Sequence, residues 1–220
     1  LMYAQNIQKK IIPAKFPEIE NYSIAGISIP ANELGGDYFD LVYLKGGIPT
    51  ILIGDVSGKG VSSALYLAEL KGIVLSIAES VVTAQELLIK LNEILYPNLE
   101  KQIFITLSAI SLKDKAGNIE YTRAGHTPLA IKQNGTIQYI APKGIALGLA
   151  SPTIFNNNLV SYCTELHAND ICFLYSDGLS ELWNPQNIEF GEEGIVNLLS
   201  NNHIANAQDL ITRAINEIDN

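Results

Sequence analysis

Apolar residues along the chain follow two patterns, short runs typical of strands and spacings of three and four typical of helices. Residues 23–30, 38–44 and 48–56 are apolar runs bounded by glycine and proline, so they predict three strands. The third run is apolar almost throughout, which is typical of a buried strand. Recurring leucines then predict helices over residues 61–80 and 83–95.

The second half of the chain predicts hairpins and then further helices. Four apolar runs separated by turn residues read as antiparallel hairpins: residues 103–112, 119–123, 129–132 and 137–140. Asn134-Gly135 is the strongest turn signal among them. Later elements are a strand and two helices, at residues 171–175, 191–200 and 205–218. Because strands and helices are grouped rather than alternating, the pattern predicts an α+β layered sandwich.

Composition narrows the class of protein. Of the 220 residues, 47% are hydrophobic and 17% are charged, which indicates one globular domain with a sizeable core. A formal net charge of −9 disfavours nucleic acid and anionic lipid as partners. Cys163 and Cys172 are expected to be reduced thiols rather than a disulfide. We find no signal core and no apolar run near the ~20 residues of a membrane span, so the expected location is the cytoplasm, either as a cytoplasmic protein or as the cytoplasmic domain of a larger, membrane-attached one.

The first candidate motif is Gly35-Gly36-Asp37-Tyr38-Phe39-Asp40. Two glycines let the backbone turn tightly and bring the Asp37 carboxylate to a strand edge, where a hard cation could bind it. A plain glycine turn with a solvated aspartate is the alternative. Asp37 and Asp40 face opposite sides of a strand, so they are not expected to share a site.

The second motif, Gly54-Asp55-Val56-Ser57-Gly58-Lys59-Gly60, joins a buried strand to a helix. An acid at the end of an apolar strand is unfavourable unless it is paired or bound to metal. A phosphate-binding P-loop is excluded, because that motif has four residues before its Gly-Lys pair and a serine or threonine after it. Lys59 either attracts phosphate or is simply solvated.

The third motif is Tyr175-Ser176-Asp177-Gly178, with Glu181 shortly after it. Asp177 is thus the third aspartate that ends a strand beside a glycine. If the fold brings these acids together, their mutual repulsion requires cations, and oxygen ligands suit Mg²⁺ or Mn²⁺. Two such ions can bind a phosphoryl oxygen and lower the pKa of a water.

A histidine in Ala124-Gly125-His126-Thr127-Pro128 has two interpretations. His126 could act as a general acid for a leaving group, or it could stabilise a turn by hydrogen bonding. Arg123 is similarly undecided.

Taken in order, these motifs resemble those of the metal-dependent protein phosphatases of the PPM (type 2C-like) class, and more closely their bacterial SpoIIE/RsbU branch. The resemblance covers nearly the whole chain. The matching segments are Ile11-Ile12-Pro13, Pro30-Ala31, the motifs of Asp37 and Asp55, Ala124-Gly125-His126, the segment from Tyr175 to Glu181, and Phe190-Gly191.

The resemblance implies a four-layer αββα sandwich with two central, mainly antiparallel sheets and two divalent cations, Mn²⁺ or Mg²⁺, at one end. In this family the acid that matches Asp55 bridges the metals, and the carbonyl that matches Val56 is a further ligand. Acids that match Asp37 and Asp177 complete the site, so these three aspartates are the predicted catalytic residues. Candidates for contact with the substrate or with the ligands are Lys59, His126 and Gly178.

The resemblance also implies partners. The usual substrate is a phosphoserine or phosphothreonine on a small anti-anti-sigma protein of STAS type, so dephosphorylation acts in bacterial signalling. The helix pair at 61–95 resembles the family's switch element. Residues 1–15 are expected to be a linker or regulatory segment, with a helix at 2–12 that connects to an upstream sensor domain and can form a homodimer. Residues 16–220 are expected to be the phosphatase domain.

One departure from the family pattern concerns the C-terminal end. Family members usually carry an Asp-Asp-x-Thr strand whose acid is another metal ligand, whereas this sequence stops at Asp219-Asn220. Asp219 follows the last predicted helix without the usual loop, so that role is not assigned to it. The domain is expected to lack this strand, and a non-catalytic or impaired signalling module of the same fold is the alternative function.

Overall fold

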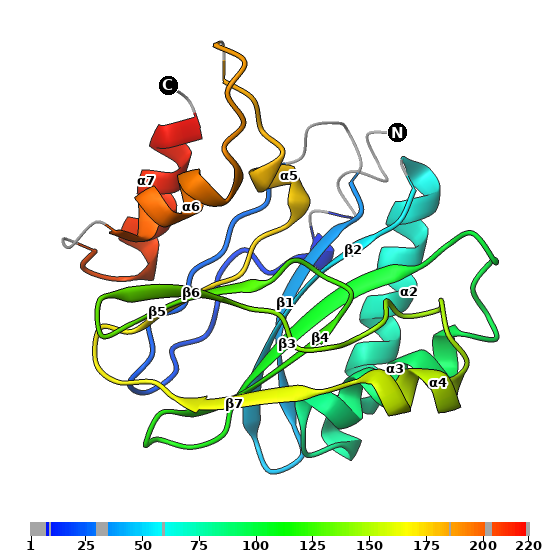
Figure 1. Ribbon diagram of the computed structural model, residues 1–220. Helices are drawn as coiled ribbons and strands as arrows, with labels where there is room; N and C mark the ends of the chain where they lie inside the picture. The colour runs from blue at the N-terminus through cyan, green and yellow to red at the C-terminus, as the bar shows by residue number, and fades with distance from the viewer. Residues whose placement is uncertain are drawn as a thin grey trace.

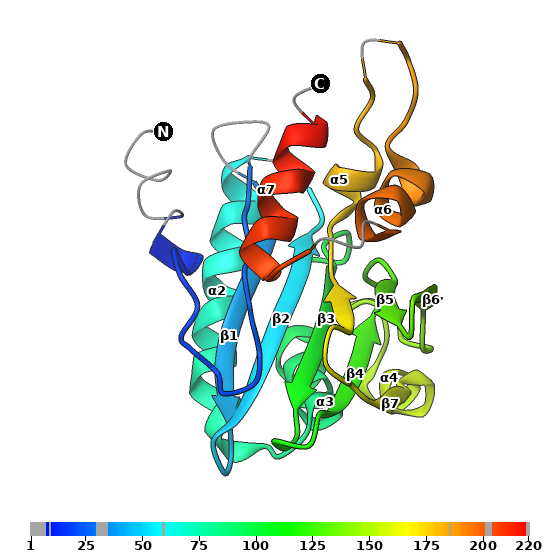
Figure 2. The ribbon, with the colours of Figure 1, turned by 90° about the vertical axis from the view of Figure 1, so that its left-hand side faces the viewer.

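Two antiparallel sheets lie face to face at the centre of the molecule, and helices cover both outer sides (Figures 1 and 2). The computed structural model describes residues 8, 10–29, 35–58, 60–184, 186–200 and 204–218. One sheet has the strand order β1-β2-β3-β4-β7 and the other β6-β5-β8. The strands are β1 (Asp37–Leu44), β2 (Ile48–Val56), β3 (Ile105–Leu112), β4 (Asn118–Ala124), β5 (Leu129–Gln133), β6 (Thr136–Ile140), β7 (Ser161–Glu165) and β8 (Ile171–Phe173). The helices are α2 (Val61–Ile77), η1 (Ala78–Ser80), α3 (Ala84–Leu95), α4 (Pro152–Asn158), α5 (Asp177–Ser180), α6 (Gly191–Ser200) and α7 (Ala207–Ile218).

Three apolar clusters hold these layers together. Leu67 of α2 and Leu91 of α3 belong to the largest cluster, which packs both helices on the five-stranded sheet. A second cluster joins the three-stranded sheet to α6 and α7 through side chains such as Leu198 and Leu210. The third fills the space between the sheets and includes Tyr121. The structure therefore has the predicted αββα order of layers.

Most predicted elements occur at or near their expected bounds. Strand β2 and helix α6 have the predicted ends, and β3–β4 and β5–β6 are antiparallel neighbours as expected. Asn134 and Gly135 both have positive φ, which a two-residue hairpin turn with the right-handed twist of the strands requires. Cys163 and Cys172 are free thiols, as predicted.

The predicted strand at 23–30 is wrong. Residues 23–29 form no strand, and residue 30 lies outside the described part of the chain. Ile27 and Ile29 are exposed, while Gly26 packs against the ring of Phe16, which contacts Phe39. The run has the composition of a strand, but it makes no ladder with a neighbouring strand. Of the helix expected at 2–12, only residues 8 and 10–12 are described, and residues 8, 10 and 11 are helical.

Helix α2 also corrects an expectation drawn from composition. By length and composition alone, Val61–Ser80 is apolar enough to cross a membrane, so the statement that no run approaches that length is wrong. In the structure Leu67, Leu70 and Val74 of this segment are fully buried against the sheet. A core helix can have the same length and composition as a membrane span, so those two properties do not distinguish them.

A partly buried ion pair connects α2 to β1. Lys71 donates to Asp40 over 2.8 Å and to the backbone carbonyl of Ile11 over 2.9 Å. Asp40 is 4% exposed and also accepts hydrogen bonds from the Tyr38 hydroxyl and the Leu41 amide. Asp40 therefore points toward α2 and away from Asp37, as the strand period predicts.

Candidate metal centre

Two of the predicted aspartates lie side by side on neighbouring strands. β1 and β2 pair so that Asp37 is directly opposite Asp55. Like charges at opposite positions of an antiparallel pair repel each other. Both side chains are half-buried at the same end of the sheet, where β1 begins and β2 ends. The backbone ladder thus fixes the separation of the two carboxylates.

Gly36 leaves room for two oxygen atoms beside this pair. A Cβ atom at position 36 would lie 2.5 Å from Asp55 Oδ1 and 2.5 Å from the carbonyl oxygen of Val56. Both oxygens therefore face one point, close enough together for a single cation to contact both. The Val56 amide donates to the Gly36 carbonyl over 3.2 Å, so the close approach is part of the strand pairing. Any side chain at position 36 would press on both oxygens.

Asp177 reaches the same end of the molecule from the other sheet. It is the first residue of α5, which follows β8 (Figure 1), and its side chain is exposed. Ser176, just before it, lies close enough to the Asp37 carboxylate to lower its pKa. The β8–α5 connection therefore brings the third motif into contact with the first.

The charges of the neighbouring carboxylates act on both Asp37 and Asp55. Burial, and then the charges of Asp37 and Asp177, raise the pKa of Asp55 from 3.8 to about 7. Burial also raises the pKa of Asp37, with a further contribution from Asp177 and an opposing one from Ser176. Raised carboxylate pKa values show that ionising the whole cluster is unfavourable unless positive charge enters.

These oxygens fit hard divalent cations. Asp37, Asp55 and Asp177 together with the Val56 carbonyl form an oxygen-only donor set, which suits Mg²⁺ or Mn²⁺. Among the described residues, no three histidine, cysteine, aspartate or glutamate side chains converge as ligands of one ion.

His126 is buried behind this cluster, with an exposure of 4%. Its Nδ1 lies 2.9 Å from the Thr106 hydroxyl, which in turn contacts the backbone amide and carbonyl of Asp55 at 3.3 Å. Burial lowers the pKa of His126 to about 4, although Asp177 and the Tyr175 carbonyl act in the opposite direction. Within the described residues, Nε2 has no hydrogen-bond partner.

This environment favours the structural interpretation of His126 over the general-acid one. A neutral imidazole at neutral pH has no readily released proton for a leaving group. Its ring instead connects β3, through Thr106, with the region around Asp177. Gly125 has a φ of 72°, and a Cβ there would lie 2.9 Å from Ala146, so the turn before His126 requires glycine. Arg123 donates to the His126 carbonyl and to the Pro142 carbonyl, which gives it a structural role.

The remaining predicted residues stay without an assigned role. Lys59 lies outside the described residues. Gly178 is exposed, and a Cβ there would meet nothing closer than Ser176 Oγ at 3.5 Å, so sterics do not require glycine.

Sequence reasoning missed Thr106 and the contact between Ser176 and Asp37. Thr106 is one of three polar residues in the apolar run 103–112, and its place opposite Asp55 becomes visible only in the register of β2 and β3.

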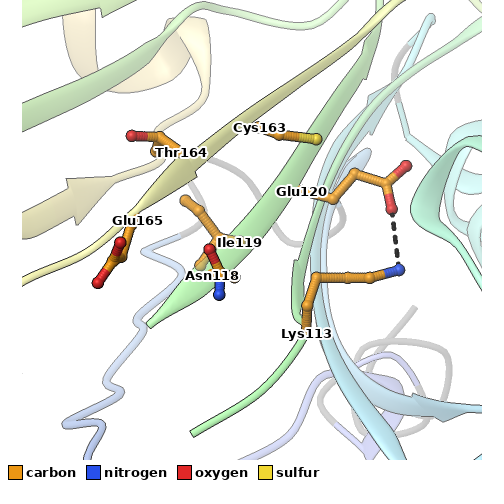
Figure 3. A pocket seen from close by; sticks show the side chains of 7 residues that line it. All are labelled: Lys113, Asn118, Ile119, Glu120, Cys163, Thr164 and Glu165. Atoms are coloured by element: carbon orange, nitrogen blue, oxygen red, sulfur yellow. Dashed lines mark hydrogen bonds and ion pairs between the residues drawn. The ribbon is translucent and has the colours of Figure 1, made fainter. Parts of the chain in front are cut away.

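A hollow elsewhere on the surface is unrelated to these carboxylates. It has a volume of about 440 Å³ and is lined by residues of β4 and β7 and by Lys113 (Figure 3). Lys113 directly follows the last residue of β3. Thr106, which pairs with Asp55 of β2, lies at the opposite end of that strand. Within the hollow, Lys113 pairs with Glu120 over 3.4 Å, and Glu120 also accepts a hydrogen bond from Ser161.

Comparison with known sequences agrees with the motif order. The family model described as Stage II sporulation protein E (SpoIIE) matches residues 46–220. The chain is 29% identical over 180 residues to phosphoserine phosphatase RsbU of Bacillus subtilis, which covers 81% of this chain and 52% of RsbU. It is 21% identical to protein IcfG of Synechocystis, over 94% of this chain and 36% of IcfG. The chain thus spans about half the length or less of these relatives.

Solved structures support the same fold. The SiaA-PP2C domain of Pseudomonas aeruginosa superposes with a TM-score of 0.78 at 16% identity, covering 98% of this chain and 86% of that domain. The PP2C phosphatase domain of SpoIIE from Bacillus subtilis gives a TM-score of 0.66 at 19% identity, covering 83% of this chain and 52% of that one. The chain therefore belongs to the SpoIIE family, and its relatives include the phosphoserine phosphatase RsbU and the PP2C phosphatase domain of SpoIIE.

Proposed function

We propose that this chain is the catalytic domain of a bacterial signalling protein and hydrolyses phosphoserine or phosphothreonine in a partner protein. The observation that carries the proposal is the cluster of Asp37, Asp55 and Asp177 beside the Val56 carbonyl, in which the pKa of Asp55 is about 7 before any cation binds. Such a cluster is unfavourable for stability alone and is typical of a site that uses metal ions.

In this proposal the chain's residues hold two divalent cations, Mn²⁺ or Mg²⁺. Asp55, the Val56 carbonyl and Asp37, which lies opposite Asp55, would hold the ions together with Asp177 from α5. When bound, the cations polarise the phosphoryl group and make water a stronger nucleophile. A bond from the water oxygen to phosphorus forms while the phosphorus–oxygen bond to the serine breaks, and the serine oxygen takes up a proton.

We further propose a STAS-type protein as the partner and a cytoplasmic location for the domain. The similarity to RsbU supports the partner assignment. So does the fold likeness to a Mycobacterium tuberculosis protein with RsbU and RsbW domains, at a TM-score of 0.65 and 20% identity.

Phosphate release from a phosphoserine peptide tests the proposal. We expect turnover that requires Mn²⁺ or Mg²⁺ and is abolished in Asp55→Asn and Asp37→Asn. Glu93→Gln on α3 removes the same charge from an exposed position and serves as the control. Equal turnover by wild type and Asp55→Asn would refute the assigned site. Metal binding without turnover would favour the non-catalytic alternative.

A further inference from the structure

A hairpin between α5 and α6 exposes large apolar side chains. It comprises residues 182–184 and 186–190, here called the Trp183 hairpin, and it projects from the end of the molecule that carries α5 (Figures 1 and 2). Trp183 and Ile188 are each 63% exposed, and Leu182 is 38% exposed. A protruding element that presents its largest apolar groups to solvent is a candidate contact surface.

Backbone and side-chain hydrogen bonds keep this hairpin ordered. The Asn184 amide donates to the Ile188 carbonyl over 2.9 Å, and the Phe190 amide donates to the Leu182 carbonyl over 2.7 Å. The Asn184 side-chain oxygen also accepts from the amides of Gln186 and Ile188. Trp183 pairs with Glu189, so Trp183 lies on one face of the hairpin and Ile188 on the other. A partner could therefore contact both faces of an ordered element.

The Trp183 hairpin lies close enough to the candidate metal centre for one partner protein to contact both. Trp183 is six residues after Asp177, and the first four residues of that stretch are helical. The chain between them spans at most about 15 Å. A typical interface buries about 800 Å² on each partner, which corresponds to a patch with a radius of about 16 Å. A protein that delivers its phosphoserine to Asp177 would therefore reach the Trp183 hairpin.

The charges around the hairpin indicate what kind of partner fits. Four exposed glutamates border it, at positions 181, 189, 192 and 193, and residues 181–200 contain no lysine or arginine. Two copies of this chain meeting here would bring these like charges together, which is unfavourable. A partner with an apolar contact flanked by basic side chains fits instead.

We propose that the Trp183 hairpin docks the phosphoprotein substrate, whose phosphorylated residue is bordered by apolar and basic side chains. The inference rests on the proposed phosphatase function. Tryptophan in the middle of an interface commonly contributes a large part of the binding energy.

Two phosphoserine peptides of about 15 residues, which reach about 50 Å when extended, test this docking surface. One carries leucine and arginine around the phosphoserine, and the other carries leucine and glutamate. The proteins are wild type, Trp183→Ala, Ile188→Ala and the control Ile154→Ala, which removes an equally apolar, 53% exposed side chain from α4. Fluorescence anisotropy of labelled peptides in EDTA measures binding to every protein without turnover.

We expect the arginine peptide to bind more tightly than the glutamate peptide. Trp183→Ala should weaken its binding about tenfold, whereas Ile154→Ala should not change it. Since Trp183 is the only tryptophan in the chain, its emission should also shift when the peptide binds wild type. Turnover of para-nitrophenyl phosphate should be the same in wild type and Trp183→Ala, because that small ester does not reach the hairpin.

Three results would overturn the docking surface: equal peptide binding by wild type and Trp183→Ala, a preference for the glutamate peptide, or a Trp183 emission shift with protein concentration alone. The last result would indicate a second copy of the chain as the occupant. If wild type hydrolyses no phosphoester but the arginine peptide still binds through Trp183, the phosphatase proposal fails and the docking surface stands.

Discussion

Replacing Asp55 by asparagine should stabilise the metal-free protein. The pKa of Asp55 is 3.8 when the chain is unfolded and about 7 in the folded state. The folded protein therefore binds more protons than the unfolded chain between these values, so the free energy of unfolding falls as the pH rises through this window. Above about pH 7 the full penalty is present, and asparagine, which carries no charge, removes it.

The size of the effect follows from the pKa difference. Each unit of pKa corresponds to 1.36 kcal/mol, which gives about 4 kcal/mol for a fully shielded group. Because Asp55 is only partly buried, solvent screening reduces this to about 2 kcal/mol. For a domain of this size, that gain raises the Tm by about 4–8 °C.

Urea unfolding in EDTA, followed by circular dichroism at pH 5 and pH 8, measures the difference. The free energy of unfolding of Asp55→Asn should be higher than that of wild type at pH 8 and close to it at pH 5. Glu93→Gln should have the free energy of unfolding of wild type at both pH values. Adding Mn²⁺ should stabilise wild type and not Asp55→Asn, because only a ligand that binds the native state raises the free energy of unfolding. If Asp55→Asn is no more stable than wild type at pH 8, the repulsion argument is wrong.

Three further changes test other parts of the structure. Gly36→Ala places a methyl group against the Asp55 carboxylate, so calorimetry should show at least about a tenfold loss of Mn²⁺ affinity, and unchanged affinity would contradict the assigned ligand geometry. Lys71→Met leaves the buried Asp40 without its cation and should lower the free energy of unfolding by about 3 kcal/mol. Adding Asp40→Asn should restore part of this loss, whereas an unchanged free energy of unfolding in Lys71→Met would show that the ion pair contributes nothing to stability. The pKa of His126 is about 4, so its ring signals should not titrate by NMR between about pH 5 and 8. Its contribution to the free energy of unfolding should be lost as the pH falls from about 6.5 to about 4. Titration of the ring signals near pH 6.5 would refute the burial of His126.

The sequence predicted those parts of the fold that depend on local pattern. β2 and α6 were found at their predicted ends, since an apolar run bounded by turn residues and a three-to-four spacing each specify one kind of element. Helix α4 was missed because its single buried side chain, Phe155, gives no periodic signal. Residues 23–29 were predicted as a strand because composition does not show whether a neighbouring strand is available.

For the candidate site, the motifs identified the aspartates but not what surrounds them. Asp37 and Asp55 each follow a glycine at a strand end, and Asp177 precedes a glycine shortly after a strand, a pattern that is visible in the sequence. The contact of Thr106 with both His126 and the Asp55 backbone depends on strand register and on the packing of two sheets, which no linear pattern reports. Trp183 was overlooked because its unusual property is the 63% exposure of its side chain, which the sequence does not show.

The pairing of Asp37 with Asp55 has a consequence for how the domain responds to its supply of metal. Small zinc modules acquire their structure only when the ion arrives, because their ligands lie on segments that are otherwise unstructured. In this chain the ladder between β1 and β2 holds Asp37 and Asp55, the two proposed ligands, at neighbouring positions before any cation binds. On the proposed metal assignment, the domain would stay folded without its cations, and the concentration of free Mn²⁺ or Mg²⁺ would set the fraction of the protein that is active without exposing the chain to proteolysis.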